Sequence, residues 1–310
     1  MHGVALMAVT GAFGFSGRHI AARLLAAGHE VVNLTNHPGR TDPFDGRTRV
    51  RPLAFDDDRL AADLAGVDTL FNTYWVRFAR GSTDHRLAVA NSRLLLAAAG
   101  RAKVRRVVHV SIANLEERPS DPYYAGKGEV EQALRAAGPS WAILRPAVLF
   151  GDEPILVNSI AWLLRHLPVF MIPGDGEYGI QPAHVEDLAD LAVAAAASDE
   201  NAVRDVAGPE RFSFDEFVRL IRDETGSRSL VVHAPARIAL LAAQLVSPFL
   251  GDVLITPQEM RGLTANVLVS HQPALGRRPF SAWLHESAPW LGRQYLSEVG
   301  RHFATGAPRA

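Results

Sequence analysis

The stretch that decides the fold is Thr10-Gly11-Ala12-Phe13-Gly14-Phe15-Ser16-Gly17, which follows the apolar run Val4–Val9. An uninterrupted apolar run is typical of a parallel strand that is buried on both faces. In the turn after it, Gly11 permits a tight change of direction, Gly14 lets the backbone approach a diphosphate, and Gly17 lets the next helix pack closely. The free N–H groups and positive dipole end of that helix favour phosphate. The stretch therefore predicts a dinucleotide-binding turn; a glycine turn without a ligand is the alternative.

The alternation of strands and helices continues as far as residue 150. Helical periodicity follows the glycine turn up to Gly28, and Val31–Leu34 then completes a βαβ unit. The predicted strands are Val4–Val9, Val31–Leu34, Val50–Leu53, Thr69–Thr73, Val107–Ser111 and Trp141–Leu144. Because helical segments separate them at βαβ spacing, we predict an α/β fold with a doubly wound parallel sheet, the Rossmann architecture.

Beyond Gly151 the alternation fails. Ile155–Leu167 is predicted to be helical, Pro168–Gly176 to be a loop, and residues 203–208 to return one more strand to the main sheet. The sequence thus predicts a dinucleotide-binding domain and a smaller, mostly helical substrate or lid region. The first covers residues 1–150 with 177–208 returning to it, and the second covers residues 151–176 and 209–310.

Composition excludes several classes of protein. The net charge of −1 gives no electrostatic footprint for nucleic acid, and the absence of cysteine excludes disulfides, a thiolate nucleophile and cysteine zinc sites. The histidines form no H-x-x-x-H pair, so no metal is predicted. No signal-peptide pattern starts the chain, and neither Ile155–Ile172 nor Ile238–Leu250 reaches the ~18 uninterrupted apolar residues of a membrane span. We expect a cytoplasmic monomer or homodimer that acts on a small molecule.

The carboxyl ends of the strands indicate which nucleotide fits, because ligands of doubly wound sheets bind there. An Asp or Glu after the second strand would hold the ribose 2′-hydroxyl of NAD. Here Thr35, Asn36 and His37 occupy that position, and Arg40 follows closely. An arginine fork suits a 2′-phosphate, so we predict NADP, with NAD as the alternative. The alternative is that Arg40 is a solvated loop residue.

Two further strand ends supply candidate cofactor contacts. After the third strand, the backbone of Phe55 or the side chain of Asp56 is expected near the adenine. Asn72 and Thr73 end the fourth strand and precede Tyr74-Trp75. Polar groups followed by aromatics fit the surroundings of the ribose and nicotinamide. A packed aromatic loop is the alternative interpretation.

The glycine spacing, G-x-x-G-x-x-G after a threonine, resembles the extended and atypical branches of the short-chain dehydrogenase/reductase superfamily. The motifs TGAFGFSG, NTYWVRF, VSIANL, YYAGK, LRPAVLFG and HVEDLA carry this resemblance from residue 1 to about residue 190. Their order resembles NAD(P)-dependent epimerase/dehydratase-like proteins, especially relatives of the nucleotide-binding accessory subunit of respiratory complex I. These branches contain epimerases, dehydratases, reductases and catalytically silent NAD(P)H-binding relatives.

The resemblance implies a catalytic triad of Ser111, Tyr123 and Lys127. Tyr123 and Lys127 lie four residues apart and therefore share one helix face. In the family pattern the tyrosine hydroxyl exchanges the proton as hydride moves, the lysine ammonium lowers the tyrosine pKa and binds the nicotinamide ribose, and the serine hydroxyl holds the substrate oxygen. Gly126 and Gly128 weaken this helix, which indicates either backbone close to the cofactor or a relaxed, non-catalytic site.

The exit of the sixth strand, LRPAVLFG, places Pro146 beside the nicotinamide in the same resemblance. The predicted cofactor-binding residues are Gly11, Phe13, Gly14, Phe15, Asn36, Arg40, Phe55, Asn72, Thr73, Lys127 and Pro146. The predicted function is an NAD(P)-dependent oxidoreductase or epimerase acting on a small carbonyl or hydroxyl substrate, with tyrosine as general acid or base. The alternative is a catalytically silent NADP(H)-binding sensor or assembly subunit.

Overall fold

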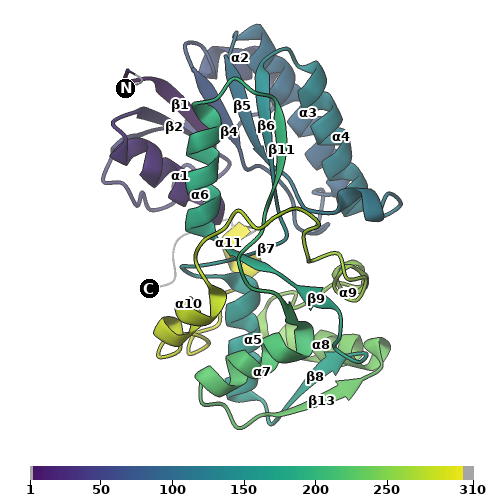
Figure 1. Cartoon of the computed structure of the whole chain (residues 1–310). Helices are drawn as coiled ribbons and strands as arrows, with labels where there is room; N and C mark the ends of the chain where they lie inside the picture. Colours follow the sequence, from purple (N-terminus) through teal and green to yellow (C-terminus); the bar gives the residue numbers. More distant parts are fainter. Residues whose placement is uncertain (1–2, 303–310) are drawn as a thin grey trace. The chain divides into compact units, whose positions relative to one another are not determined.

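A seven-stranded sheet, six of whose strands come from the first 146 residues, is the largest sheet of the computed structural model, which describes residues 3–302 (Figure 1). Its strand order is β11-β6-β5-β4-β1-β2-β3, and every neighbouring pair is parallel. The strands are β1 (Leu6–Thr10), β2 (Glu30–Thr35), β3 (Thr48–Pro52), β4 (Thr69–Asn72), β5 (Arg106–Val110), β6 (Ser140–Pro146) and β11 (Ala202–Val206). This confirms the predicted doubly wound sheet, whose strand order reverses between β1 and β4.

Helices cover both faces of this sheet. On one face lie α1 (Phe15–Ala26) and α6 (Val185–Ala196), which run side by side (Figure 1). On the other face α2 (Asp57–Asp63), α3 (His85–Arg101) and α4 (Pro122–Ala136) pack against the strands, and a single turn of 3-10 helix, Leu115–Glu117, precedes α4. Burial on both faces is why the central strand β1 consists mostly of apolar residues, whereas the edge strand β3 alternates polar and apolar residues.

The chain forms two compact units. The first consists of the residues up to Ala147 together with Ala183–Ala207 and Ser270–Arg277, and it contains the large sheet. The second consists of Val148–Pro182, Gly208–Val269 and the residues from Arg278 onward. The strand predicted over residues 203–208 does return to the main sheet, as β11 beside β6.

The second unit combines helices with short strands. Its longest helices are α5 (Ile155–His166), α7 (Phe214–Glu224) and α8 (Ala236–Leu250). The remaining elements from β7 onward are β7 (Val148–Phe150), β8 (Val169–Pro173), β9 (Gly179–Ile180), β10 (Pro182–His184), β12 (Phe212–Ser213), β13 (Leu230–Ala234), α9 (Pro257–Leu263), α10 (Phe280–Ser287) and α11 (Glu298–His302). The predicted loop over Pro168–Gly176 is wrong, because most of it is β8, which pairs in parallel with β13.

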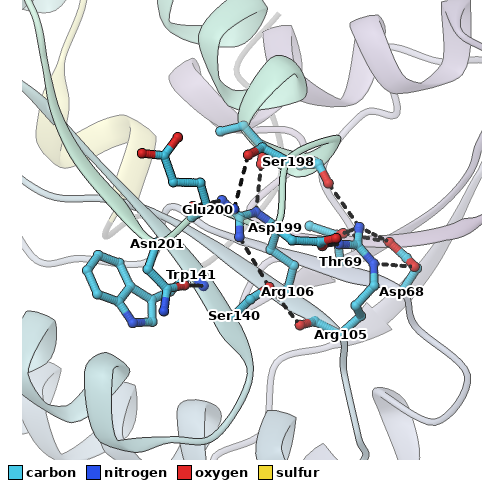
Figure 2. Close-up of polar contacts among 12 residues, drawn as sticks. Asp68, Thr69, Arg105, Arg106, Ser140, Trp141, Ser198, Asp199, Glu200 and Asn201 are labelled. Carbon is cyan, nitrogen blue, oxygen red and sulfur yellow. Dashed lines mark hydrogen bonds and ion pairs between the residues drawn. The ribbon is translucent and has the colours of Figure 1, made fainter.

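Two consecutive arginines bind the amino ends of the strands to the last turn of α6 (Figure 2). Arg106 is 1% exposed, and its guanidinium donates to the carbonyls of Ala195 (2.6 Å) and Glu200 (2.7 Å) and to Ser140 Oγ (3.1 Å). Arg105 binds Asp68 and donates to the carbonyl of Ala196 at 2.9 Å. Cationic groups at a helix C-terminus satisfy carbonyls that the helix leaves without partners.

Replacing Arg106 by Met should therefore destabilise the fold. The variant leaves buried carbonyls without donors, and we expect the free energy of unfolding in urea to fall by about 3 kcal/mol. Arg204→Met is the control, because the Arg204 side chain is 52% exposed and lies 3.7 Å from one carboxylate. The control should change stability by less than about 0.5 kcal/mol. Equal stability of the Arg106 variant and the wild type would contradict the assigned role.

Candidate functional site

The predicted site residues follow the carboxyl ends of the parallel strands, at one edge of the sheet. Gly11 and Gly14 follow β1, Asn36 and Arg40 follow β2, Phe55 follows β3, Thr73 follows β4, Ser111 follows β5, and Pro146 ends β6. Since all of these strands run in the same direction, their ends line one edge, where such sheets bind ligands. This edge of the first unit is the candidate cofactor site.

The glycine turn after β1 has the geometry that its sequence predicts. Gly11 has a φ of +66°, a left-handed conformation that favours glycine, and its carbonyl accepts from Gly14 N at 2.7 Å. The turn is also held from β2, because Asn33 Oδ1 accepts from Ala12 N at 2.8 Å. A Cβ on Gly17 would lie 2.2 Å from the Gly11 carbonyl oxygen, so only glycine fits there.

The amino end of α1 has no side-chain cap. Its N-cap residue is Gly14, no side chain accepts from its first amides, and no acidic residue lies in its first turn. By contrast, α2 is capped by Asp56 and α4 by Asp121. An uncapped helix terminus presents N–H donors and a positive dipole end, the combination that binds phosphate. Asp56 therefore caps α2, and a contact of the Phe55 backbone or of Asp56 with the adenine stays a prediction.

The two phenylalanines of the turn differ in their surroundings. Phe13 is 9% exposed and its ring lies 6.2 Å from that of Phe44, so its side chain belongs to the core. Phe15 is half-buried beside His19 in the first turn of α1. Only the backbone of Phe13 is therefore available to a ligand.

The corner after β2 is basic. Asn36 is exposed, and His37 N donates to Thr35 Oγ1 at 3.0 Å. Arg40 is half-buried, and its backbone N–H donates to the His37 carbonyl at 3.1 Å. The first acid after this turn is Asp42, whose carboxylate accepts from backbone amides of the following residues. No carboxylate of residues 35–40 competes with an anion, which suits a ribose 2′-phosphate.

A buried polar network connects the ends of β1, β4 and β5. Thr73 donates from Oγ1 to the Thr10 carbonyl (2.6 Å) and from N to Thr10 Oγ1 (2.7 Å). Asn72 is fully buried; its Oδ1 accepts from Tyr74 N at 3.1 Å, and its Nδ2 lies 3.2 Å from His109 Nδ1. The side chain of Asn72 therefore positions the strand ends, and it has no face toward a cofactor.

Lys127 lies buried on α4 with 4% exposure. Its Nζ donates to the Val110 carbonyl at 3.0 Å and lies 4.7 Å from the centre of the Trp75 ring. Burial lowers the pKa of Lys127 to about 7, against the opposing charge of Glu131. Burial and the neighbouring Lys127 lower the pKa of His109 to about 3, so this histidine is neutral.

Tyr123 lies in the first turn of α4, on the same helix face as Lys127 but closer to solvent. Asp121 accepts from Tyr123 N at 3.0 Å and caps the helix, whose first residue is Pro122. The half-buried Tyr123 ring meets those of Trp75 (5.8 Å) and His85 (5.5 Å) edge-on. Tyr123 and Lys127 are thus one helical turn apart and both contact Trp75.

The third member of the predicted triad has a different partner. Ser111 is 5% exposed, and its Oγ donates to Glu131 Oε1 at 2.6 Å. Glu131 is itself buried and receives two hydrogen bonds from Arg145, at 2.8 and 2.6 Å. Because Glu131 lies two helical turns beyond Tyr123, this contact holds Ser111 away from the start of α4. A role for Ser111 in holding a substrate oxygen stays a prediction that this geometry does not favour.

The sequence interpretation missed Glu131, Arg145, His109 and His85 as neighbours of the site. One signal was present, since Glu131 follows Lys127 by four residues and so continues the helix face that begins at Tyr123. The partners of that face from β5 and β6 are distant in sequence and gave no local signal. Gly126 now has a structural reason, because a Cβ there would lie 3.0 Å from Trp75 Cη2.

Two properties of the described residues bear on other classes of protein. Across residues 3–302 no three acidic or histidine side chains gather in a way that could hold a metal ion. Among the helices described, none has the length and apolar character needed to cross a bilayer.

Comparison with known proteins bears on the fold and on the class of cofactor. Residues 11–161 match the family model described as NAD(P)H-binding. Over 91% of this chain and 98% of its own length, (4-alkanoyl-5-oxo-2,5-dihydrofuran-3-yl)methyl phosphate reductase of Streptomyces griseus is 29% identical. Subunit 9 of the mitochondrial NADH dehydrogenase (ubiquinone) 1 alpha subcomplex of Arabidopsis thaliana is 24% identical over 84% of this chain and 70% of its own length.

Solved structures share the fold. The NADPH-dependent quinone oxidoreductase QOR2 of Escherichia coli, solved with NADPH, superposes with a TM-score of 0.72 at 21% identity, over 91% of this chain and 98% of that one. UDP-N-acetylglucosamine 4-epimerase of Methanobrevibacter ruminantium shares the fold with a TM-score of 0.68 at 21% identity, over 93% of this chain and 98% of that one. The expected resemblance to the complex I accessory subunit is confirmed by the similarity in sequence.

The lowered pKa of Lys127 predicts how stability depends on pH. Between about pH 7 and 10.5 the unfolded chain holds a proton on this amine that the folded chain lacks, so stability rises with pH. We expect the free energy of unfolding to rise by about 1 kcal/mol per pH unit there, and Lys127→Met to lose this slope. Urea titrations between pH 7 and 10 measure it. Lys103→Met, at an exposed position, should keep the wild-type slope; an unchanged slope in Lys127→Met would refute the prediction.

Proposed function

With residues 11–161 matching the NAD(P)H-binding family, we propose that this protein is an NADP(H)-dependent oxidoreductase or epimerase acting on a small carbonyl or hydroxyl substrate. The observation that carries the proposal is the uncapped amino end of α1. It lies at the same edge of the sheet as the carboxyl end of β5, where the Val110 carbonyl accepts a hydrogen bond from Lys127. The named reductases among the similar proteins support the oxidoreductase class. We assign substrate recognition to the second unit and a cytoplasmic location to the protein.

When bound, the nicotinamide supplies or accepts a hydride. The amides at the start of α1 hold the diphosphate, and the glycine turn lets it approach. Tyr123 is the general acid that protonates the substrate oxygen during reduction, or the base in the reverse direction. Lys127 binds the ribose and places its positive charge one helical turn from Tyr123. Glu131 and Arg145 hold the middle of α4 against the sheet and so fix the positions of both groups.

Removal of the Tyr123 hydroxyl tests the catalytic assignment. In Tyr123→Phe we expect kcat for NADPH-dependent reduction of a panel of quinones, ketones and aldehydes to fall by about 100-fold or more, with the Kd for NADPH unchanged. Tyr124→Phe is the matched control, because this neighbouring tyrosine is buried, and it should retain most of the activity. Equal kcat in Tyr123→Phe and the wild type would exclude Tyr123 as the general acid.

A catalytically silent NADP(H)-binding protein is the second candidate. Two contacts favour it: the Ser111 hydroxyl donates to Glu131, and the Trp75 ring lies over the Lys127 ammonium group. Both contacts keep these side chains from the roles that the family pattern gives them. Tight NADPH binding with no turnover across the substrate panel would support this candidate. Measurable turnover that depends on Tyr123 would exclude it.

Arg40 is proposed to select NADPH over NADH. Arg40→Met should weaken NADPH binding by about tenfold, equivalent to about 1.4 kcal/mol, because a charge-assisted contact to the 2′-phosphate is lost, while NADH binding is unchanged. Arg47→Met is the control: this arginine is exposed and its Nε donates to the Phe44 carbonyl. Fluorescence titration with both nucleotides measures the ratio. A wild type that prefers NADH would overturn the assignment.

A further inference from the structure

Trp75 covers the ammonium group of Lys127. The Trp75 ring centre lies 4.7 Å from Nζ, within the range of a cation–π contact, while Nζ donates to the Val110 carbonyl. With only 4% of Lys127 exposed, the indole and the β5 backbone enclose the amine. An amine enclosed in this way cannot touch a nucleotide unless one of the two moves, and Val110 is fixed in the middle of the sheet.

Aromatic contacts hold the Trp75 indole in this position. The His85 ring stacks on it at 6.0 Å with an interplanar angle of 4°, and the Tyr123 ring meets it edge-on. The missing side chain of Gly126 makes the room, since a Cβ there would lie 3.0 Å from Cη2 of the indole. Aromatic contacts of this kind stabilise the position, by roughly 0.5–1.5 kcal/mol for each pair.

One feature destabilises this position of the indole. Trp75 Nε1 is buried and has no hydrogen-bond partner among the described residues. A buried donor without an acceptor costs about 1–3 kcal/mol, a penalty that is removed when the indole turns toward water. Trp75 also lies in the segment between β4 and α3 rather than within a helix or strand, so its displacement breaks no regular element.

We propose that Trp75 is a movable cover over Lys127, and that the ribose of the nicotinamide nucleotide and the indole compete for the same ammonium group. This rests on the proposed NADP(H) site. Departure of the indole also frees the Tyr123 ring on the side that it contacts. The cover thus couples cofactor binding to exposure of both side chains.

Amine acylation tests the cover without any nucleotide. Lys103 and Lys127 are the two lysines of the chain, and Lys103 is exposed, so each protein carries its own reference. With N-hydroxysuccinimidyl acetate at pH 8 and peptide mass spectrometry, we expect wild-type Lys127 to react at least about tenfold more slowly than Lys103. Trp75→Ala should bring the two rates within about threefold. Trp141→Ala is the control, because Trp141 contacts a cation elsewhere, Arg135 at 5.3 Å, and Lys127 should stay protected.

A second variant keeps the test decisive if Trp75→Ala does not fold. Trp75→Leu keeps an apolar side chain at this position but lacks the indole that lies over Nζ, and it should also expose Lys127. NADPH should then protect Lys127 in the open variant and associate with it faster than with the wild type. Failure of NADPH to bind at all would refute the proposed function alone. The acylation rate of Lys127 would still show whether Trp75 shields this amine, because that experiment needs no nucleotide. The cover is refuted if wild-type Lys127 reacts as fast as Lys103, or if Lys127 stays unreactive in both variants.

Discussion

A diphosphate held by the backbone amides at the start of α1 is the interaction on which the assigned chemistry depends. Three residues shape the turn that would hold it: Gly11 turns the chain, Gly17 lacks the side chain that would separate helix and turn, and Asn33 fixes the turn from β2. No side chain caps this helix, although acids cap α2 and α4. The hydrogen-bonding capacity left at one helix end matches an anionic ligand.

The helix α4 spaces the functional groups at intervals of one turn. Tyr123, Lys127 and Glu131 share one face and pass from a half-buried to a buried environment. Glu131 is neutralised by Arg145, so the charge next to Lys127 is balanced. Desolvation dominates at Lys127, and its lowered pKa follows from its depth in the fold. The burial that lowers the pKa of Lys127 also separates its ammonium group from a ligand. Trp75 matters because its ring provides part of that burial.

Local patterns were sufficient to predict the strands of the sheet and the glycine turn, because each depends on neighbours within a few residues. They failed where partners are distant. The strand β8 pairs with β13 sixty residues later, so its short run between two prolines gave no sign of it. The family resemblance predicted that Ser111 holds the substrate oxygen, whereas its hydroxyl donates to Glu131. Only the packing of α4 beside the end of β5 creates this contact.

The most direct measurement is an amide NMR titration of the 15N-labelled protein with NADPH. If the diphosphate rests on α1, the amide resonances of Phe15, Ser16 and Gly17 shift most strongly among those of the first unit, and the same amides shift with inorganic pyrophosphate at higher concentration. If NADPH leaves these three resonances unchanged, or shifts only residues away from the strand ends, the helix does not hold a nucleotide and the assigned chemistry has no basis.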